Sequence, residues 1–192
     1  MVRIIIAGPR CAGKTVLGQH LANALAMRHV EASDLMRTLL DREGLPGEPL
    51  DDFAQRTVRY NPCAVPHELR RGDHLDDNVV LTGLRSAREV ECIERLCSIP
   101  PLLLYVDAAP EVRVARCATR GRLDTAHIDI SGMSRYDRLH TAMGLQEIRS
   151  LPSVHFIENN YTNLFDYFTI VMTTMSSVEN RRISDCSYGE AS

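Results

Sequence analysis

A glycine-bounded segment near the start of the chain reads Gly8-Pro9-Arg10-Cys11-Ala12-Gly13-Lys14-Thr15. It fits the pattern G-x-x-x-x-G-K-[ST] at each fixed position, between an apolar, β-branched run at residues 2–7 and an amphipathic run at residues 14–27. A strand, a glycine-rich turn and a helix in this order aim backbone N–H groups and the positive end of the helix dipole at one point. The segment therefore predicts a phosphate-binding loop.

Lys14 is the only lysine of the chain, so arginine accounts for the other 21 of its 22 basic residues. Such a bias is typical of a GC-rich genome, in which arginine replaces lysine wherever either residue serves. A lysine retained against this bias marks a place where a compact ammonium differs from a planar guanidinium, as in a tight phosphate cradle. The same count argues against a GTPase, because the guanine-recognition pattern N/T-K-x-D needs another lysine.

The composition is that of one globular domain, with 44% apolar and 24% charged residues over 192 positions. A net charge of −3 gives no overall basic field for nucleic acid, and no apolar run reaches the roughly 18 residues of a membrane span. The six cysteines form no C-x-x-C pair, so we expect free thiols and no zinc site. The expected location is a reducing cytoplasm, that of a host if a phage encodes the chain.

Apolar periodicity predicts alternating strands and helices along the chain. The expected strands are residues 2–7, 29–31, 78–82, 102–107 and 154–158. The expected helices are 14–27, 33–43 with Ser33 or Asp34 as N-cap, pieces within 50–72, then 87–97, 110–120, 133–150 and 163–175. This alternation predicts an α/β fold, a three-layer α/β/α sandwich with a parallel five-stranded sheet, and with the loop a P-loop NTPase fold. We expect one domain over 1–176 and a flexible C-terminal tail at 177–192.

Polar motifs follow the expected strand ends. They are Asp34-Leu35-Met36-Arg37, Thr82-Gly83-Leu84-Arg85 with its continuation to Val90, and Ile157-Glu158-Asn159-Asn160 with Asn163-Leu164. With the loop, these segments resemble the nucleoside-monophosphate-kinase branch of the P-loop kinases, which includes adenylate kinases, phage deoxynucleotide kinases and dephospho-coenzyme A kinases. The arginines at 113, 116, 120 and 122 look like that branch's arginine-bearing helix and lid, although we expect Arg113 itself at the surface.

The resemblance implies a phosphotransferase that uses ATP and Mg²⁺, with an acceptor-binding insertion at about 34–77 and a lid at about 120–134. The implied catalytic residues are Lys14, Asp34, Arg85, Arg116 and Arg120. The implied ATP-binding residues are Gly8, Arg10, Cys11, Ala12, Gly13, Lys14, Thr15, Val16, Arg120 and Asn159. The acceptor would contact Asp34, Arg37 and Arg85, and Mg²⁺ would contact Thr15 and Asp34.

The sequence departs from the family pattern at one position that matters for the metal. Thr82 stands where the family has an acidic residue at the end of the third strand. The missing carboxylate would come from Asp34, or from Asp107 at the end of the fourth strand.

The acceptor stays open between several classes at this point. A (deoxy)nucleoside monophosphate fits the resemblance best. The alternatives are hydroxyl groups, either dephospho-coenzyme A or the hydroxymethyl group of a modified pyrimidine in DNA, such as 5-hydroxymethyluracil. For a hydroxyl acceptor Asp34 would act as general base. For a base in DNA, the side chains of Arg56, Arg59, Arg70 and Arg71 would in addition follow the DNA backbone. A second alternative is a nucleotide-binding protein without turnover. We expect no membrane partner, and the preference for ATP over GTP rests on the resemblance.

Overall fold

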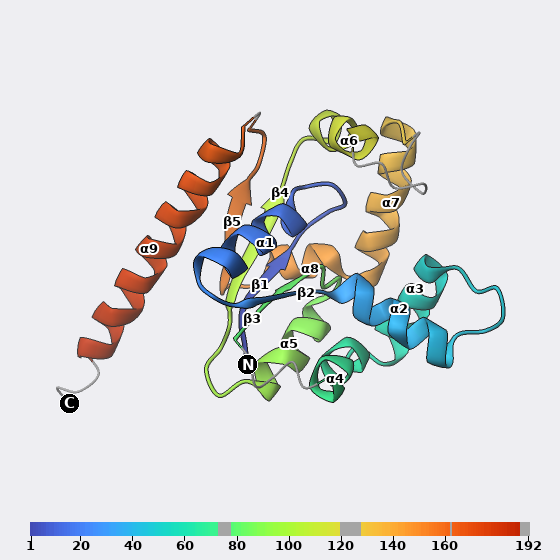
Figure 1. Cartoon of the computed structure of the whole chain (residues 1–192), viewed down its shortest axis with the longest axis horizontal. Helices are drawn as coiled ribbons and strands as arrows, with labels where there is room; N and C mark the ends of the chain where they lie inside the picture. Colours follow the sequence, from blue (N-terminus) through green and yellow to red (C-terminus); the bar gives the residue numbers. More distant parts are fainter. Residues whose placement is uncertain (73–77, 120–127, 162, 189–192) are drawn as a thin grey trace.

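Five parallel strands form the central sheet of the computed structural model, in the order β2-β3-β1-β4-β5 (Figure 1). The structure describes residues 1–72, 78–119, 128–161 and 163–188, the last twelve of these by their backbone alone. The strands are β1 (Val2–Ala7), β2 (Arg28–Glu31), β3 (Val79–Thr82), β4 (Leu102–Asp107) and β5 (Val154–Glu158). The prediction of a parallel five-stranded α/β sandwich is confirmed.

Helices connect the strands and cover both faces of the sheet. They are α1 (Lys14–Ala24), α2 (Ala32–Glu43), α3 (Leu50–Tyr60), α4 (Ala64–Arg71), α5 (Ala87–Leu96), α6 (Pro110–Thr119), α7 (Ile130–Met143), α8 (Leu145–Arg149) and α9 (Leu164–Tyr188). Within the part of the chain that the structure describes, none of these helices combines the length and apolarity that crossing a membrane requires.

The alternation of side chains along β1 explains the two cores. Ile4 and Ile6 pack with α1 and α9, whereas Ile5 and Ala7 pack with α2 to α5 and α8 on the other face. Val2 lies on the same face as Ile5 although the two are three positions apart, because the pairing of β1 with β3 shifts register between Val2 and Ile4. Burial on both faces is why the strand reads as a continuous apolar run rather than as an alternating one.

Several helix boundaries differ from those predicted; for example, α1 ends at Ala24 rather than at residue 27, and α7 begins at Ile130 rather than at residue 133. Helix α2 begins at Ala32 with Glu31 as its N-cap, so the expectation of Ser33 or Asp34 in that place is wrong and Asp34 lies in the first turn. The helix expected over 133–150 is broken at Gly144, which has a φ of 105°. Helix α9 continues to Tyr188, well beyond the predicted end at Met175. The flexibility expected of the tail stays a prediction.

Two disulfides correct the expectation of free thiols. Cys11 is joined to Cys117, and Cys63 is joined to Cys92, with Cα atoms 5.9 Å and 5.5 Å apart. The partners are 106 and 29 positions apart in the sequence, so no local spacing announces them. Cys97 is a free thiol, and Cys186 lies where side chains are not described. The cytoplasmic location stays a prediction.

Candidate active site

The loop between β1 and α1 has a backbone that only glycine fits at its two ends. Gly8 and Gly13 have φ values of 137° and 103°, which side-chain-bearing residues rarely adopt. A Cβ atom at Gly8 would overlap the carbonyl oxygen of Val106, and one at Gly13 would overlap the amide nitrogen of Asn159. The first and last glycines of the motif therefore let the loop lie against β4 and against the end of β5.

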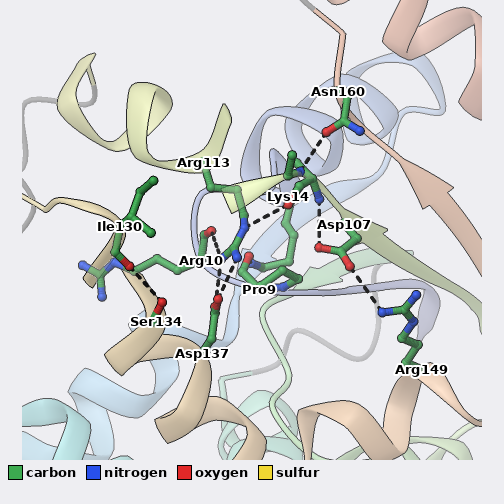
Figure 2. Close-up of polar contacts among 12 residues, drawn as sticks. Pro9, Arg10, Lys14, Asp107, Arg113, Ile130, Ser134, Asp137, Arg149 and Asn160 are labelled. Carbon is green, nitrogen blue, oxygen red and sulfur yellow. Dashed lines mark hydrogen bonds and ion pairs between the residues drawn. The ribbon is translucent and has the colours of Figure 1, made fainter. Parts of the chain in front are cut away.

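Lys14 and Thr15 open helix α1, and the N-terminal end of a helix favours an anion because its backbone N–H groups and the helix dipole point toward that end. The Lys14 ammonium donates a hydrogen bond to the carbonyl oxygen of Pro9 at 2.6 Å, so it lies across the loop (Figure 2). Lys14, Thr15 and Cys11 line two separate cavities, one on each side of the loop. The loop is thus the shared wall of two candidate binding sites.

The first cavity has a volume of about 560 Å³ and lies between the loop, helix α6 and the connection from β5 to α9. Asn159 is buried at its floor, where its side chain donates to the carbonyl oxygen of Ala12 at 2.8 Å and accepts from Arg116 at 3.3 Å. Arg116 also donates to the carbonyl oxygen of Tyr161 at 2.9 Å. The cavity wall includes Gly13, Lys14, Thr15, Val16, Arg116, Thr119, Tyr161, Asn163, Leu164 and Tyr167.

Arg113 is buried, with an exposed fraction of 4%, so the expectation that it lies at the surface is wrong. Its guanidinium forms a two-pronged ion pair with Asp137 on helix α7, at 2.8 Å and 2.7 Å. It also donates to the backbone carbonyl oxygens of Ala108 and Arg10. The pair is visible beside the loop in Figure 2. A charge buried this deeply needs such partners, and the sequence alone does not show them.

The second cavity has a volume of about 300 Å³ and lies on the other side of the loop, where α2, α3, the end of β3 and α7 meet. Four cationic side chains line it, namely Arg10, Lys14, Arg37 and Arg85. Burial lowers the pKa of Arg85, while the nearby carboxylates of Asp51 and Glu89 favour its charged form. Among the described residues no carboxylate forms an ion pair with Arg85, and its guanidinium approaches the sulfur of Met143 at 3.9 Å.

Arg37 and Asp34 lie together, but the second does not face the cavity. Their side chains form an ion pair at 2.7 Å on the exposed surface of α2, and Arg37 alone of the two lines the cavity. The carboxylates that do line it are Glu31, at the end of β2, and Asp51, in the first turn of α3. Asp107 accepts from the backbone N–H of Ala108 and approaches Arg149 at 3.6 Å, outside both cavities (Figure 2).

Thr82 is buried at the carboxyl end of β3, where the family pattern has an acidic residue. Its hydroxyl lies 3.0 Å from the Nε2 atom of His29, an imidazole whose pKa burial lowers. Glu31 pairs with Thr82 in the register of β2 and β3. A carboxylate is therefore present at the carboxyl ends of the strands, on the strand next to the one where it was expected. The sequence offered a signal for this, because Glu31 ends a predicted strand just as Thr82 does.

Two further cavity residues come from α7 and were missed. Tyr136 lies under the guanidinium of Arg10, with 4.2 Å from the guanidinium carbon to the ring centroid, in a cation–π contact. His140 is buried, and burial together with Arg85, Lys14, Arg10 and Arg113 lowers its pKa to about 3. Its imidazole is therefore neutral at physiological pH. No motif in the sequence marks either residue.

The donor set at the loop fits a magnesium ion of the kind that accompanies a nucleotide. Mg²⁺ prefers oxygen ligands and is held by one or two protein groups together with phosphates and water. The Thr15 hydroxyl and the Glu31 and Asp51 carboxylates line one cavity, which meets that requirement. Among the described residues no cluster of three or more His, Cys, Asp or Glu side chains forms a complete metal site of its own.

The remaining predicted residues fall into two groups. Arg120 and Arg122, with most of the lid expected at 120–134, fall outside the described residues. The arginines proposed to follow DNA lie on α3 and α4. Arg56 is paired there with Glu48 at 2.9 Å, and Arg59 lies over the ring of Tyr60.

Comparisons with known proteins agree with this architecture. A family model described as an AAA domain matches residues 7–131, well over half of the chain. A UPF0200 protein of Saccharolobus islandicus is 31% identical over 169 residues, which cover 85% of this chain and 87% of the relative. The chain therefore belongs to the family that this AAA-domain model describes, together with the UPF0200 relatives, within the P-loop kinase-like superfamily.

Solved structures of low sequence identity share the fold. A shikimate kinase from Bacteroides thetaiotaomicron superimposes with a TM-score of 0.61 at 15% identity, covering 93% of this chain and 98% of that one. A gluconokinase from Sinorhizobium meliloti superimposes with a TM-score of 0.61 at 16% identity, covering 99% and 97%. These likenesses establish a P-loop fold of the kinase type.

Proposed function

We propose that this member of the P-loop kinase-like superfamily transfers the γ-phosphate of ATP to the phosphate of a nucleoside or deoxynucleoside monophosphate. The observation that carries the proposal is the pair of cavities that share Lys14 and Thr15. A donor nucleotide in the first and an acceptor in the second would meet over the N-terminus of α1. Phosphoryl transfer needs this arrangement, since its catalysis consists of positioning and charge stabilisation.

On the donor side, the loop amides and the Lys14 ammonium would hold the β- and γ-phosphates of ATP. Lys14 would exchange its hydrogen bond to the Pro9 carbonyl oxygen for the phosphate oxygens. The nucleoside would occupy the cavity of about 560 Å³, where Arg116 and Asn159 form the polar floor and Leu164 and Tyr167 contribute apolar surface. A cavity that combines apolar surface with a few fixed polar groups is typical of nucleotide sites.

On the acceptor side, Arg85 and Arg37 would bind the acceptor phosphate, and Arg10 would add positive charge beside the transferred group. Arginine suits this task because its fork donates two parallel hydrogen bonds to phosphate. Arg85 lacks an ion-pair partner among the described residues, so a bound anion would supply the missing counter-charge. A phosphate acceptor needs no general base, which is consistent with the exposed, paired position of Asp34.

Thr15 would hold Mg²⁺ directly, and Glu31 would hold its water shell from the end of β2. The bound ion would neutralise charge that accumulates on the phosphate oxygens. Asp34 was predicted to contact Mg²⁺, and Glu31 is better placed because it lines the cavity that Thr15 also lines.

A hydroxyl acceptor is the second candidate, because two carboxylates do line the acceptor cavity. Glu31 or Asp51 could take the proton from a hydroxyl group as it attacks. The names of the structural neighbours, shikimate kinase and gluconokinase, are those of enzymes whose acceptors carry hydroxyl groups. Dephospho-coenzyme A and hydroxymethylated pyrimidines in DNA belong to this class.

A transfer assay with γ-labelled ATP and Mg²⁺ tests both candidates. The acceptors are the common ribo- and deoxyribonucleoside monophosphates, dephospho-coenzyme A, shikimate, gluconate, and DNA with and without hydroxymethylated pyrimidines. Lys14→Ala serves as the inactive control, and Arg95→Ala on the exposed face of α5 as the matched surface control. Label on a monophosphate supports the first candidate. Label on hydroxyl acceptors alone replaces it with the second, and no transfer to any acceptor contradicts both.

A further inference from the structure

One face of helix α6 contacts three consecutive residues of the phosphate-binding loop. Arg113 donates to the carbonyl oxygen of Arg10 at 3.4 Å, Arg116 donates to that of Ala12 at 3.5 Å, and Cys117 is bonded to Cys11. Residues at i, i+3 and i+4 share one side of a helix, so a single face of α6 supports the middle of the loop. Helix α6 thus holds the loop at Arg10, Cys11 and Ala12.

Arg113 extends this support to a second helix. Its two terminal nitrogens bind the two carboxylate oxygens of Asp137 on α7, while its Nε donates to the carbonyl oxygen of Ala108 after β4 at 3.0 Å. One guanidinium therefore joins the end of β4, the loop and α7, as Figure 2 shows. The planar fork has fixed directions, so these three partners cannot shift independently while all the bonds persist.

Helix α7 in turn carries two residues of the acceptor cavity. Tyr136, the residue before Asp137, packs its ring against the guanidinium of Arg10, and His140 lies one turn later at the cavity wall. Arg10 is therefore held at its carbonyl oxygen by Arg113 and at its side chain by Tyr136. The loop residue that lines the acceptor cavity is fixed from both helices.

We propose that Arg113 and Asp137 are positioning residues that couple the phosphate-binding loop to helix α7. The pair keeps the loop, which would hold the donor phosphates, in register with the α7 side chains that would line the acceptor site. Neither residue lines either cavity, so both act through Arg10, Tyr136 and His140 rather than by touching a substrate. This inference rests on the proposed function and adds to it the element that aligns its two sites.

A second two-pronged pair in the same molecule provides the matched control. Arg42 on α2 binds both carboxylate oxygens of Glu68 on α4, at 3.1 Å and 2.8 Å, far from the loop in sequence and outside both cavities. Substitution of either pair removes a two-pronged bond between two helices, although Arg42 is more exposed than Arg113 and also binds Glu43. Only the Arg113–Asp137 pair also contacts the loop, so a loss of kcat that exceeds the measured loss of unfolding free energy in these variants reports coupling.

The test compares Asp137→Asn and Arg113→Lys with Glu68→Gln, using the full oxidised chain and the acceptor found in the transfer assay. We expect Asp137→Asn to lower kcat on the order of tenfold to hundredfold, because a small misplacement of reacting groups has that effect. Its KM for ATP stays within about twofold of the wild-type value, since the loop glycines and Lys14 are unchanged. Arg113→Lys behaves similarly because one ammonium cannot bind all three partners. Glu68→Gln keeps wild-type kcat.

Hydrogen exchange provides the readout that does not depend on knowing the acceptor. In the wild type and in Glu68→Gln, ATP with Mg²⁺ is expected to slow amide exchange in residues 130–143 as well as in the loop. In Asp137→Asn the loop is still protected and residues 130–143 are not. Equal kcat values for Asp137→Asn and Glu68→Gln, or unchanged protection of α7, would overturn the coupling. A wild type that binds ATP without transferring phosphate contradicts the proposed function and leaves the exchange test decisive, and a wild type that binds no ATP contradicts both.

Discussion

The two cavities on either side of the phosphate-binding loop are built in different ways. The phosphate-binding loop of the donor side is shaped largely by backbone, since two glycines, the N-terminus of α1 and a carbonyl oxygen bound by Asn159 and Arg116 determine its conformation. The acceptor side is made from side chains that stand on separate elements, among them Arg37 on α2, Asp51 on α3 and Arg85 after β3. The difference teaches that the conformation of a phosphate-binding loop can be set locally, whereas the second cavity depends on how several helices pack.

Loss of a disulfide should give the largest difference in behaviour between the donor side and the acceptor side. Cys63–Cys92 joins the N-cap residue of α4 to α5, and Cys11–Cys117 joins the loop to α6. Cys63→Ser or Cys117→Ser should each lower the free energy of unfolding by about 2–4 kcal/mol, because each bond restricts the unfolded chain. Only Cys117→Ser should also weaken ATP binding. Denaturant unfolding and nucleotide titration measure the two effects, with Cys97→Ser as the control for a free thiol.

Removal of an acceptor arginine tests whether the two sides bind independently. Arg85→Ala should raise the KM for a monophosphate acceptor on the order of tenfold to hundredfold, the value of a hydrogen-bonded charge pair. The KM for ATP should change little, because Arg85 lines only the acceptor cavity. Steady-state kinetics with each substrate varied in turn measure this, and Arg88→Ala, an exposed arginine of α5, is the control. An equal rise in both KM values would show that the sides are not separate.

The pH dependence of stability should report the buried imidazole of the acceptor side. Burial and the surrounding cations lower the pKa of His140 from 6.5 to about 3, so the unfolded chain binds a proton there that the folded chain does not. Stability should therefore fall as the pH decreases from 6.5 toward 3, by up to about 1.4 kcal/mol per pH unit from this group. His140→Asn should flatten that part of the profile, measured by denaturant unfolding at several pH values. A profile unchanged by His140→Asn would show that other groups cause the slope.

The smallest effect is expected on the donor side. The hydroxyl of Tyr167 is buried and has no hydrogen-bond partner among the described residues, and burial raises its pKa. Tyr167→Phe should leave the free energy of unfolding within about 1 kcal/mol of the wild type or raise it, because an unpaired polar atom is removed. Thermal unfolding with and without ATP measures this. A clear loss of ATP-dependent stabilisation would show that the hydroxyl binds the nucleotide.

Much of the site was predictable wherever the chemistry is contained in one segment. The phosphate-binding loop, the ends of β4 and β5, and the parallel sheet follow from local patterns, since apolar runs and glycine pairs act on their near neighbours. The resemblance implied Arg37 and Arg85 as acceptor-binding residues, and both side chains line the second cavity. It also implied Asp34, which the structure places on the exposed side of α2.

The sequence by itself determined the strand–loop–helix unit and the order of elements, because backbone conformation and hydrophobic periodicity are properties of adjacent residues. Only the tertiary structure decided that Arg113 is buried against Asp137, that Cys11 meets Cys117, and that Glu31 rather than Asp34 lines the cavity that Thr15 also lines. These contacts join positions far apart in the chain or depend on one turn of a helix. Their geometry is fixed when α6 and α7 pack against the loop, and no local spacing encodes it.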